Sequence, residues 1–216
     1  VMIDCEHGPM DLDQVEHMVR AAEVFGITPI ARIPNHADST VLRFLDRGVQ
    51  GVIVPHVNTR EEADAVARAA RYYPEGHRGV GGGRAHDYGV AATREESTRW
   101  INSQTLVIPM IEDTQAVENL EAILTVPGID VLHVASGDLG QSMGNPGRED
   151  VRRLMRGVIP AIQAGGKIAG VGGNAPSDAE GVAEFTKLGA RFVTISAWGL
   201  LRLGAEDFRR RVDAAL

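Results

Sequence analysis

The stretch Leu106-Val107-Ile108-Pro109-Met110-Ile111-Glu112 shows the pattern that decides the fold, because a run of apolar residues ends directly in a carboxylate. The run is apolar at odd and even positions alike, which predicts a strand buried on both faces, as in a parallel sheet. Helical patterns separate it from other short apolar runs, and this alternation indicates an α/β fold. Those runs cover residues 1–3, 29–33, 51–54, 129–134, 168–171 and 192–195.

Polar residues follow nearly every predicted strand. Such groups converge on one face of a (β/α)₈ barrel, whereas a Rossmann sheet is expected to carry a glycine fingerprint after its first strand. We therefore predict a single TIM-barrel domain over residues 1–216. The polar strand ends are Asp4-Cys5-Glu6-His7, Arg32, His56, Glu112, Ser136-Gly137-Asp138, Gly172-Gly173-Asn174 and Ser196.

Amphipathic patterns predict helices over residues 12–25, 41–47, 60–70, 114–124, 148–164, 177–188 and 197–216. Thr59 with Glu62 forms the capping box of one, and Ser177 is expected to cap another. Trp100 and Trp198 are interpreted as packing residues. Residues 73–99 are rich in glycine and show no strand pattern, and a loop of this length usually covers an active site or forms an interface.

The composition excludes several classes of protein. The net charge of -7 is the opposite of what binding to a phosphate backbone requires, so we expect no nucleic-acid partner. No apolar window is long enough to span a membrane, and no secretory signal is visible. The single cysteine, Cys5, cannot form an intramolecular disulfide and is interpreted as a core thiol. These features predict a cytoplasmic protein.

Two carboxylates follow strands too apolar to tolerate an unpaired charge. Glu112 and Asp138 must each be paired or bound to a cation, and two carboxylates from neighbouring strands suit Mg²⁺ or a similar hard ion. The alternative is that each forms a salt bridge with an arginine.

Three further strand ends offer groups for catalysis or binding. His7, just past a strand and near carboxylates, is placed to act as a general base, or else is a structural histidine. Arg32 could hold a substrate carboxylate, or it could pair with Glu6 or Glu112. The backbone of Ser136-Gly137-Asp138 forms a candidate anion nest.

Together these segments resemble the HpcH/HpaI family of class II, metal-dependent aldolases of 2-oxo acids. The match runs in order over essentially the whole chain. The segments are Ile3-Asp4-Cys5-Glu6-His7-Gly8-Pro9, Arg32-Ile33-Pro34, Leu45-Asp46-Arg47-Gly48, Tyr73-Pro74-Glu75-Gly76-His77-Arg78-Gly79-Val80-Gly81, Ile111-Glu112 and Gly137-Asp138-Leu139.

The resemblance implies a divalent cation, Mg²⁺, Mn²⁺ or Co²⁺, held by Glu112 and Asp138. It implies that pyruvate binds this metal, that its enolate is stabilised there, and that Arg32 contacts the substrate. It further implies that His7 is the catalytic base, oriented by Asp46 in a His-Asp dyad. Ser136 and the backbone of Gly137 and Asp138 would bind the pyruvate carboxylate. The family's last helix packs on a neighbouring subunit, which implies a homo-oligomer, a hexamer or another trimer-based assembly.

Two departures from the family pattern bear on the substrate. Met110 stands where relatives commonly carry glutamine, and Ala135-Ser136-Gly137-Asp138 replaces their Gly-Pro-x-Asp. The favoured hypothesis is a lyase that cleaves or forms 4-hydroxy-2-oxo acids, with pyruvate or an analogue and an aldehyde as its small-molecule partners. One rival is a related condensation or cleavage of a citrate-like, oxaloacetate or acyl-CoA substrate. The other is a catalytically idle barrel retained as a binding module.

The length leads to one more expectation. A (β/α)₈ barrel typically takes about 250 residues, whereas this chain has 216 residues and shows seven strand patterns, the first starting inside an apolar run. The resemblance places one further strand and helix ahead of Val1. We therefore expect the native protein to carry a first βα unit that this chain lacks, which would leave the barrel open between its first and last strands.

Overall fold

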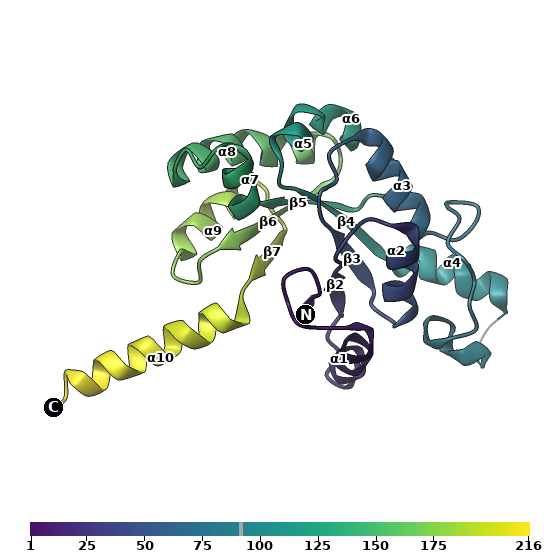
Figure 1. Cartoon of the computed structure of the whole chain (residues 1–216), viewed down its shortest axis with the longest axis horizontal. Helices are drawn as coiled ribbons and strands as arrows, with labels where there is room; N and C mark the ends of the chain where they lie inside the picture. The colour runs from purple at the N-terminus through teal and green to yellow at the C-terminus, as the bar shows by residue number, and fades with distance from the viewer. Residues whose placement is uncertain (91–92) are drawn as a thin grey trace.

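Seven parallel strands follow one another around a nearly closed barrel in the computed structural model, which describes residues 1–90 and 93–216 (Figure 1). Each strand pairs with its neighbours in sequence, in the order β1-β2-β3-β4-β5-β6-β7. Within the described ranges, β1 and β7 are the two edges of the sheet. The strands are β1 (Met2–Asp4), β2 (Ile30–Arg32), β3 (Gly51–Val54), β4 (Leu106–Ile111), β5 (Val131–Ala135), β6 (Ile168–Asn174) and β7 (Phe192–Ile195).

The (β/α)₈-type barrel predicted from the apolar runs is confirmed. The bounds of β3, β4 and β7 agree with the predicted ones, because each of these runs is flanked by polar or turn residues on both sides. The predicted limits of β5 and β6 were less exact. β5 starts two residues later than predicted, and β6 continues through Gly172 and Gly173 to Asn174.

Helices lie around the outside of the sheet, except the last one, which extends away from it (Figure 1). They are α1 (Leu12–Val24), α2 (Asp38–Asp46), α3 (Arg60–Ala70), α4 (Arg94–Gln104), α5 (Thr114–Glu118), α6 (Leu120–Leu124), α7 (Ser136–Ser142), α8 (Arg148–Ala164), α9 (Ala179–Lys187) and α10 (Ala197–Asp213), with the 3₁₀ segment η1 (Arg84–Gly89). The Thr59–Glu62 capping box of α3 is confirmed. The predicted cap at Ser177 was wrong, since the Asp178 side chain accepts the Gly181 N–H at the start of α9. The predicted helix over 114–124 is divided at Asn119 into α5 and α6.

Two apolar layers hold the barrel together. The larger layer lies between the sheet and the surrounding helices, and Cys5 belongs to it, as predicted. The smaller layer fills the barrel interior with Ile30, Ile53, Ile108, Met110, Val131 and Ala135. Because side chains alternate across a strand, Glu112 continues the interior face of Ile108 and Met110 to the carboxyl end of β4.

Residues 73–99 differ from the expectation in two ways. They contain η1 and the start of α4, which had not been predicted; Ala91 and Ala92 lie outside the described residues. The segment also packs near the amino ends of the strands, because Arg78 pairs with Asp46 at the end of α2 and Arg84 lies against Gly48. These two contacts place this described part of the segment at the end of the barrel opposite Glu112, and its role as an interface stays a prediction.

The last helix, α10, leaves the barrel and extends away from it (Figure 1). None of its residues is buried, although it carries several large apolar side chains. The interpretation of Trp100 and Trp198 as packing residues was wrong for this chain, since they are 61% and 81% exposed. Among the described residues, no helix combines the length and apolarity needed to cross a bilayer.

Candidate active site

Glu112 is the most deeply buried carboxylate at the carboxyl end of the barrel. The residue is 1% exposed, and its Oε1 accepts the backbone N–H of His56 at 2.7 Å. Burial raises the pKa of Glu112, and the negative charges of Glu6 and Asp138 raise it further, against the opposing effect of His56. A buried carboxylate is stabilised by a nearby positive charge. Both alternatives predicted for Glu112, a bound cation and a salt bridge, would supply one.

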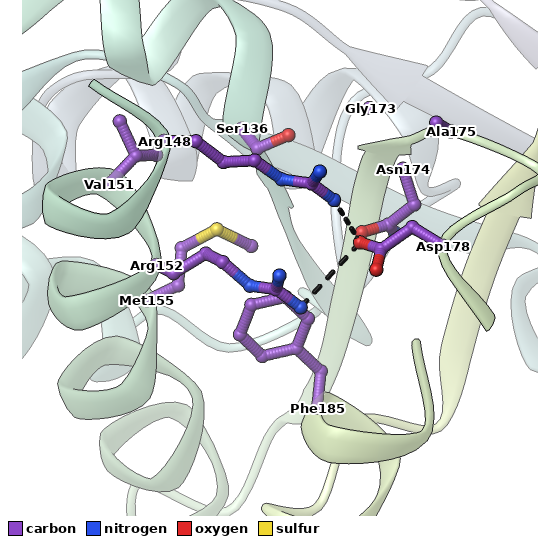
Figure 2. A pocket seen from close by; sticks show the side chains of 10 residues that line it. All are labelled: Ser136, Arg148, Val151, Arg152, Met155, Gly173, Asn174, Ala175, Asp178 and Phe185. Atoms are coloured by element: carbon purple, nitrogen blue, oxygen red, sulfur yellow. Dashed lines mark hydrogen bonds and ion pairs between the residues drawn. The ribbon is translucent and has the colours of Figure 1, made fainter. Parts of the chain in front are cut away.

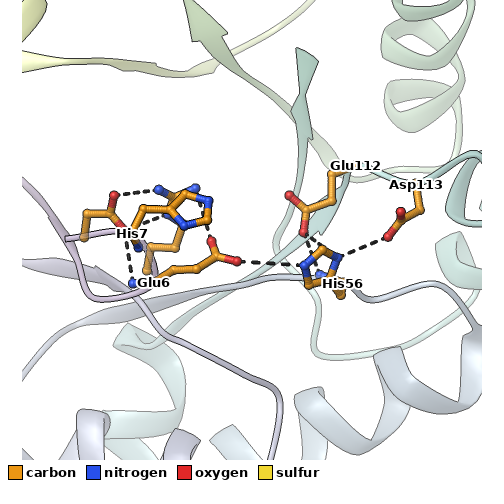
Figure 3. A network of polar contacts seen from close by, with 7 residues as sticks. Glu6, His7, His56, Glu112 and Asp113 are labelled. Atoms are coloured by element: carbon orange, nitrogen blue, oxygen red, sulfur yellow. Dashed lines mark hydrogen bonds and ion pairs between the residues drawn. The ribbon is translucent and has the colours of Figure 1, made fainter. Parts of the chain in front are cut away.

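Glu112 forms a cluster with Glu6, in the loop after β1, and His56, in the loop after β3 (Figure 3). One ligand atom from each lies within 4.8 Å of the others. The His56 ring is 3.4 Å from Glu112 Oε1 through Nδ1 and 4.0 Å from Glu6 Oε1 through Nε2. Its Nδ1 also lies 3.2 Å from Asp113 Oδ2. This arrangement of carboxylates and an imidazole can hold a divalent cation.

Neither Glu6 nor His56 had been assigned a role in this cluster from the sequence. Both stand just after predicted strands, which was the available signal. Their meeting with Glu112 depends on how three loops converge above the barrel, and the spacing along the chain does not reveal this.

Asp138, the second predicted metal ligand, lies in the first turn of α7 directly after β5. Its negative charge contributes to the raised pKa of Glu112, so the two carboxylates share one electrostatic environment. The Glu6–His56–Glu112 cluster does not include Asp138. Ligation of a metal by Glu112 with Asp138 therefore stays a prediction.

Arg32, at the end of β2, pairs with acidic residues of the β1 loop. Its Nε and Nη2 donate to Asp4 at 2.9 and 2.6 Å, and its Nη1 lies 3.2 Å from Glu6. Burial acts to raise the pKa of Asp4, but the hydrogen bonds and charge of Arg32 outweigh it and lower that pKa. The expected pairing with Glu6 is thus present, and a substrate contact by the same guanidinium stays a prediction.

The structure does not bring His7 and Asp46 together. His7 lies exposed in the loop after β1, at the carboxyl ends of the strands. Asp46 is the last residue of α2, which runs back toward the amino end of β3, and it accepts a hydrogen bond from Arg78 at 2.8 Å. No contact in the described part of this chain supports the His7–Asp46 dyad, which stays an untested prediction.

Ser136 and Gly137 begin α7 beside the end of β6. Ser136 Oγ donates to the carbonyl of Gly172 at 3.1 Å, and Gly137 is exposed. Ser136 also lines a cavity of about 250 Å³ between α8 and the loop after β6 (Figure 2). Arg148 and Arg152 reach across this cavity, but both pair with Asp178. The proposed anion nest at Ser136-Gly137-Asp138 is not tested by this arrangement.

Cys5 is not activated as a nucleophile, because burial raises the pKa of its thiol to about 11. The thiolate, which is the reactive form, is then scarce at neutral pH.

A parallel βα barrel with carboxylates, an imidazole and an arginine gathered at the carboxyl ends of its strands defines an enzyme of the TIM-barrel class. Residues 1–202 match the family model described as HpcH/HpaI aldolase/citrate lyase, and the chain belongs to this family. It is accordingly a carbon–carbon lyase.

Relatives and solved structures agree with this assignment. The chain is 37% identical over 200 residues to a 4-hydroxy-2-oxovalerate aldolase of Novosphingobium aromaticivorans, covering 89% of this chain and 73% of that protein. An HpcH/HpaI aldolase/citrate lyase family protein from Burkholderia cenocepacia superposes with a TM-score of 0.89 at 29% identity, covering 98% and 84% of the two chains. A citrate synthase superposes with a TM-score of 0.84 at 27% identity, covering 100% and 84%.

Proposed function

We propose that this protein is a metal-dependent aldolase that cleaves 4-hydroxy-2-oxo acids, or forms them, with pyruvate or an analogue and an aldehyde as the other partners. The observation that carries the proposal is the buried Glu112, whose raised pKa reflects burial beside Glu6 and Asp138 at the mouth of the barrel. The similarity to a protein named 4-hydroxy-2-oxovalerate aldolase supports the same substrate class.

The residues at this mouth fit a divalent cation. Carboxylate oxygens are the ligands that Mg²⁺ and Mn²⁺ prefer, and Co²⁺ also accepts imidazole. Glu112 and Asp138 would hold the ion. When bound, it would supply a Lewis acid that stabilises negative charge on the oxygens of a 2-oxo acid.

The remaining predicted residues would bind and orient the substrate. The backbone N–H groups of Gly137 and Asp138, with Ser136, would receive the carboxylate of the 2-oxo acid. Arg32 is held toward the mouth by Asp4 and Glu6 and would contact a substrate oxygen. A ring nitrogen of the exposed His7 would accept the proton of the 4-hydroxyl group as the bond between C3 and C4 breaks.

The test is release of pyruvate from a 4-hydroxy-2-oxo acid in the presence of Mn²⁺, Mg²⁺ or Co²⁺. We expect Glu112→Gln to lose at least about 100-fold in kcat/KM, since the ion and the charge that it stabilises depend on this carboxylate. The matched control is Glu121→Gln, at an exposed position of α6, which should keep full activity. Turnover by Glu112→Gln equal to that of the wild type would refute the proposal.

A second reaction is favoured by one specific observation, the fold similarity to a citrate synthase. Met110 fills the barrel interior two residues before Glu112 and offers no hydrogen-bond donor there. Oxaloacetate turnover measured beside aldol cleavage separates the two reactions, and a higher kcat/KM for oxaloacetate would favour the citrate-like class.

We also propose that the protein acts as a homo-oligomer in the cytoplasm. The large apolar side chains that α10 exposes support the oligomer, because such side chains gathered on one element are typical of an interaction surface. The acidic composition with a single, buried cysteine supports the compartment.

A further inference from the structure

We propose that His56 is a ligand of the divalent cation at this site, so that the centre binds imidazole-accepting ions such as Co²⁺ more tightly than Mg²⁺. The proposal rests on the metal requirement of the proposed function. It adds a nitrogen ligand to the predicted carboxylate pair.

The first argument is geometric. Two ligand atoms bound at about 2.1 Å to one ion lie roughly 3–3.5 Å apart in common coordination geometries. His56 Nδ1 is 3.4 Å from Glu112 Oε1, and the cluster with Glu6 spans no more than 4.8 Å. The His56 side chain is 60% exposed and so has room to rotate, and a small rotation of the ring would bring one nitrogen to an ion shared with Glu112.

The second argument is the backbone that holds the ring in place. His56 has a φ of 53°, in the left-handed region that non-glycine residues rarely adopt. This conformation directs its N–H to Glu112 Oε1 at 2.7 Å. The residue is thus fixed to the carboxylate through its main chain, and its ring is held next to the same oxygen.

The third argument is the balance of charge. The carboxylates of Glu6, Glu112 and Asp113 all face the His56 ring. Arg32 is engaged by Asp4 and Glu6, and the nearby Asp138 adds a further negative charge. Acidic groups at this mouth therefore outnumber the basic ones that face them in the described structure, and a divalent cation would restore the balance.

The choice of ion follows from the ligand set. Mg²⁺ is bound mainly by carboxylates and water, and it seldom takes a nitrogen ligand. Imidazole favours later transition metals, so a His56 ligand would raise the affinity for Co²⁺ and leave that for Mg²⁺ nearly unchanged.

The experiment uses the full chain and two readouts that do not depend on activity. Calorimetric titration gives the affinities for Co²⁺ and Mg²⁺, and pulsed electron paramagnetic resonance of the Mn²⁺-loaded protein detects ¹⁴N coupling from a bound imidazole. The variant is His56→Asn, because asparagine tolerates the left-handed backbone and keeps the N–H that Glu112 accepts. The matched controls are His36→Asn, at an exposed loop position, and His7→Asn, which removes the other histidine near the cluster.

We expect ¹⁴N coupling in the wild type and in both controls and its loss in His56→Asn. We also expect the Co²⁺ affinity of His56→Asn to fall by about 10- to 100-fold with little change for Mg²⁺. Binding of Mn²⁺ and Co²⁺ without ¹⁴N coupling, or coupling that is lost in His7→Asn and kept in His56→Asn, would overturn the inference and leave the proposed function standing. A wild type that binds none of the three ions would overturn the proposed function as well.

Discussion

At the scale of single residues, His133 is an unusual polar group inside the barrel. It lies in the middle of β5, opposite Met110 on β4 and Gly170 on β6, and it is 4% exposed. A Cβ on Gly172 would come within 2.4 Å of His133 Nε2, so the glycines of β6 leave the space that the ring occupies. Its Nε2 lies 3.3 Å from Thr194 Oγ1, and no hydrogen-bond partner is described for Nδ1.

This environment makes the stability of the protein depend on pH. Burial lowers the pKa of His133 to about 4, and the positive charge of Arg32 adds to the effect. In the unfolded chain the pKa of His133 is 6.5. Below this pH the unfolded chain binds a proton at His133 and the folded chain does not, so the free energy of unfolding falls as the pH drops toward 4. This group alone should account for a loss of about 3 kcal/mol across that range.

The measurement is urea denaturation at pH 7 and pH 5, compared with His133→Gln, which cannot titrate. The variant should lose markedly less stability on acidification than the wild type. His17→Gln, at an exposed position of α1, serves as the control and should behave like the wild type. Identical pH dependence in His133→Gln would show that His133 is not the group responsible.

Residues of the candidate site could be predicted from the sequence only where the pattern of a single strand determines their position. Glu112 follows an uninterrupted apolar run, and its burial was expected for that reason. The location of Asp46 was not predictable in this way. A family motif gives its position along the chain but does not show at which end of the barrel α2 ends. Glu6 and His56 come together through loop conformations, including the left-handed backbone of His56, which sequence patterns do not encode.

At the scale of elements, the start of α3 was predicted correctly because its signal is local. The Glu62 N–H donates to Thr59 Oγ1 at 3.2 Å, and Glu62 Oε2 accepts the N–H groups of Asn58 and Thr59 at 2.7 and 3.0 Å. These bonds satisfy amide groups that have no partner within the helix. The start of α4 carries the same kind of capping box, formed by Thr93 with Glu96, and was nevertheless not predicted. The division between α5 and α6 at Asn119 was not predicted either.

The capping box leads to a prediction on stability. Thr59→Ala should lower the free energy of unfolding by about 1 kcal/mol, since the side-chain acceptor for the Glu62 N–H is lost. Thr59→Ser keeps a hydroxyl at the same place and should recover most of that loss. Chemical denaturation of the three proteins checks this, and equal stability of Thr59→Ala and the wild type would contradict it.

At the scale of the whole molecule, α10 is a long helix that has no buried residue in the single chain. Trp198 and Phe208 are 81% and 70% exposed, and Leu201 is 65% exposed. Burying side chains of this size against a second copy would stabilise an assembly by about 1.5–3 kcal/mol for each one.

We expect the double variant Trp198→Glu with Phe208→Glu to shift the protein to a smaller assembly. Size-exclusion chromatography with light scattering gives the mass of each species. Arg209→Glu, at a side chain that is 84% exposed on the same helix, is the control and should leave the mass unchanged. A double variant with the mass of the wild type would exclude α10 from the interface.

The strand order has a consequence for how the chain is made. In the sheet that the structure describes, every strand pairs only with the strands that come just before and just after it in the sequence. As the chain emerges during synthesis, each strand from β2 to β7 can therefore dock on a partner that has already left the ribosome. Until its successor arrives, the newest strand is a temporary sheet edge, so β2 to β6 each pass through a stage at which they are open to pairing with another nascent chain.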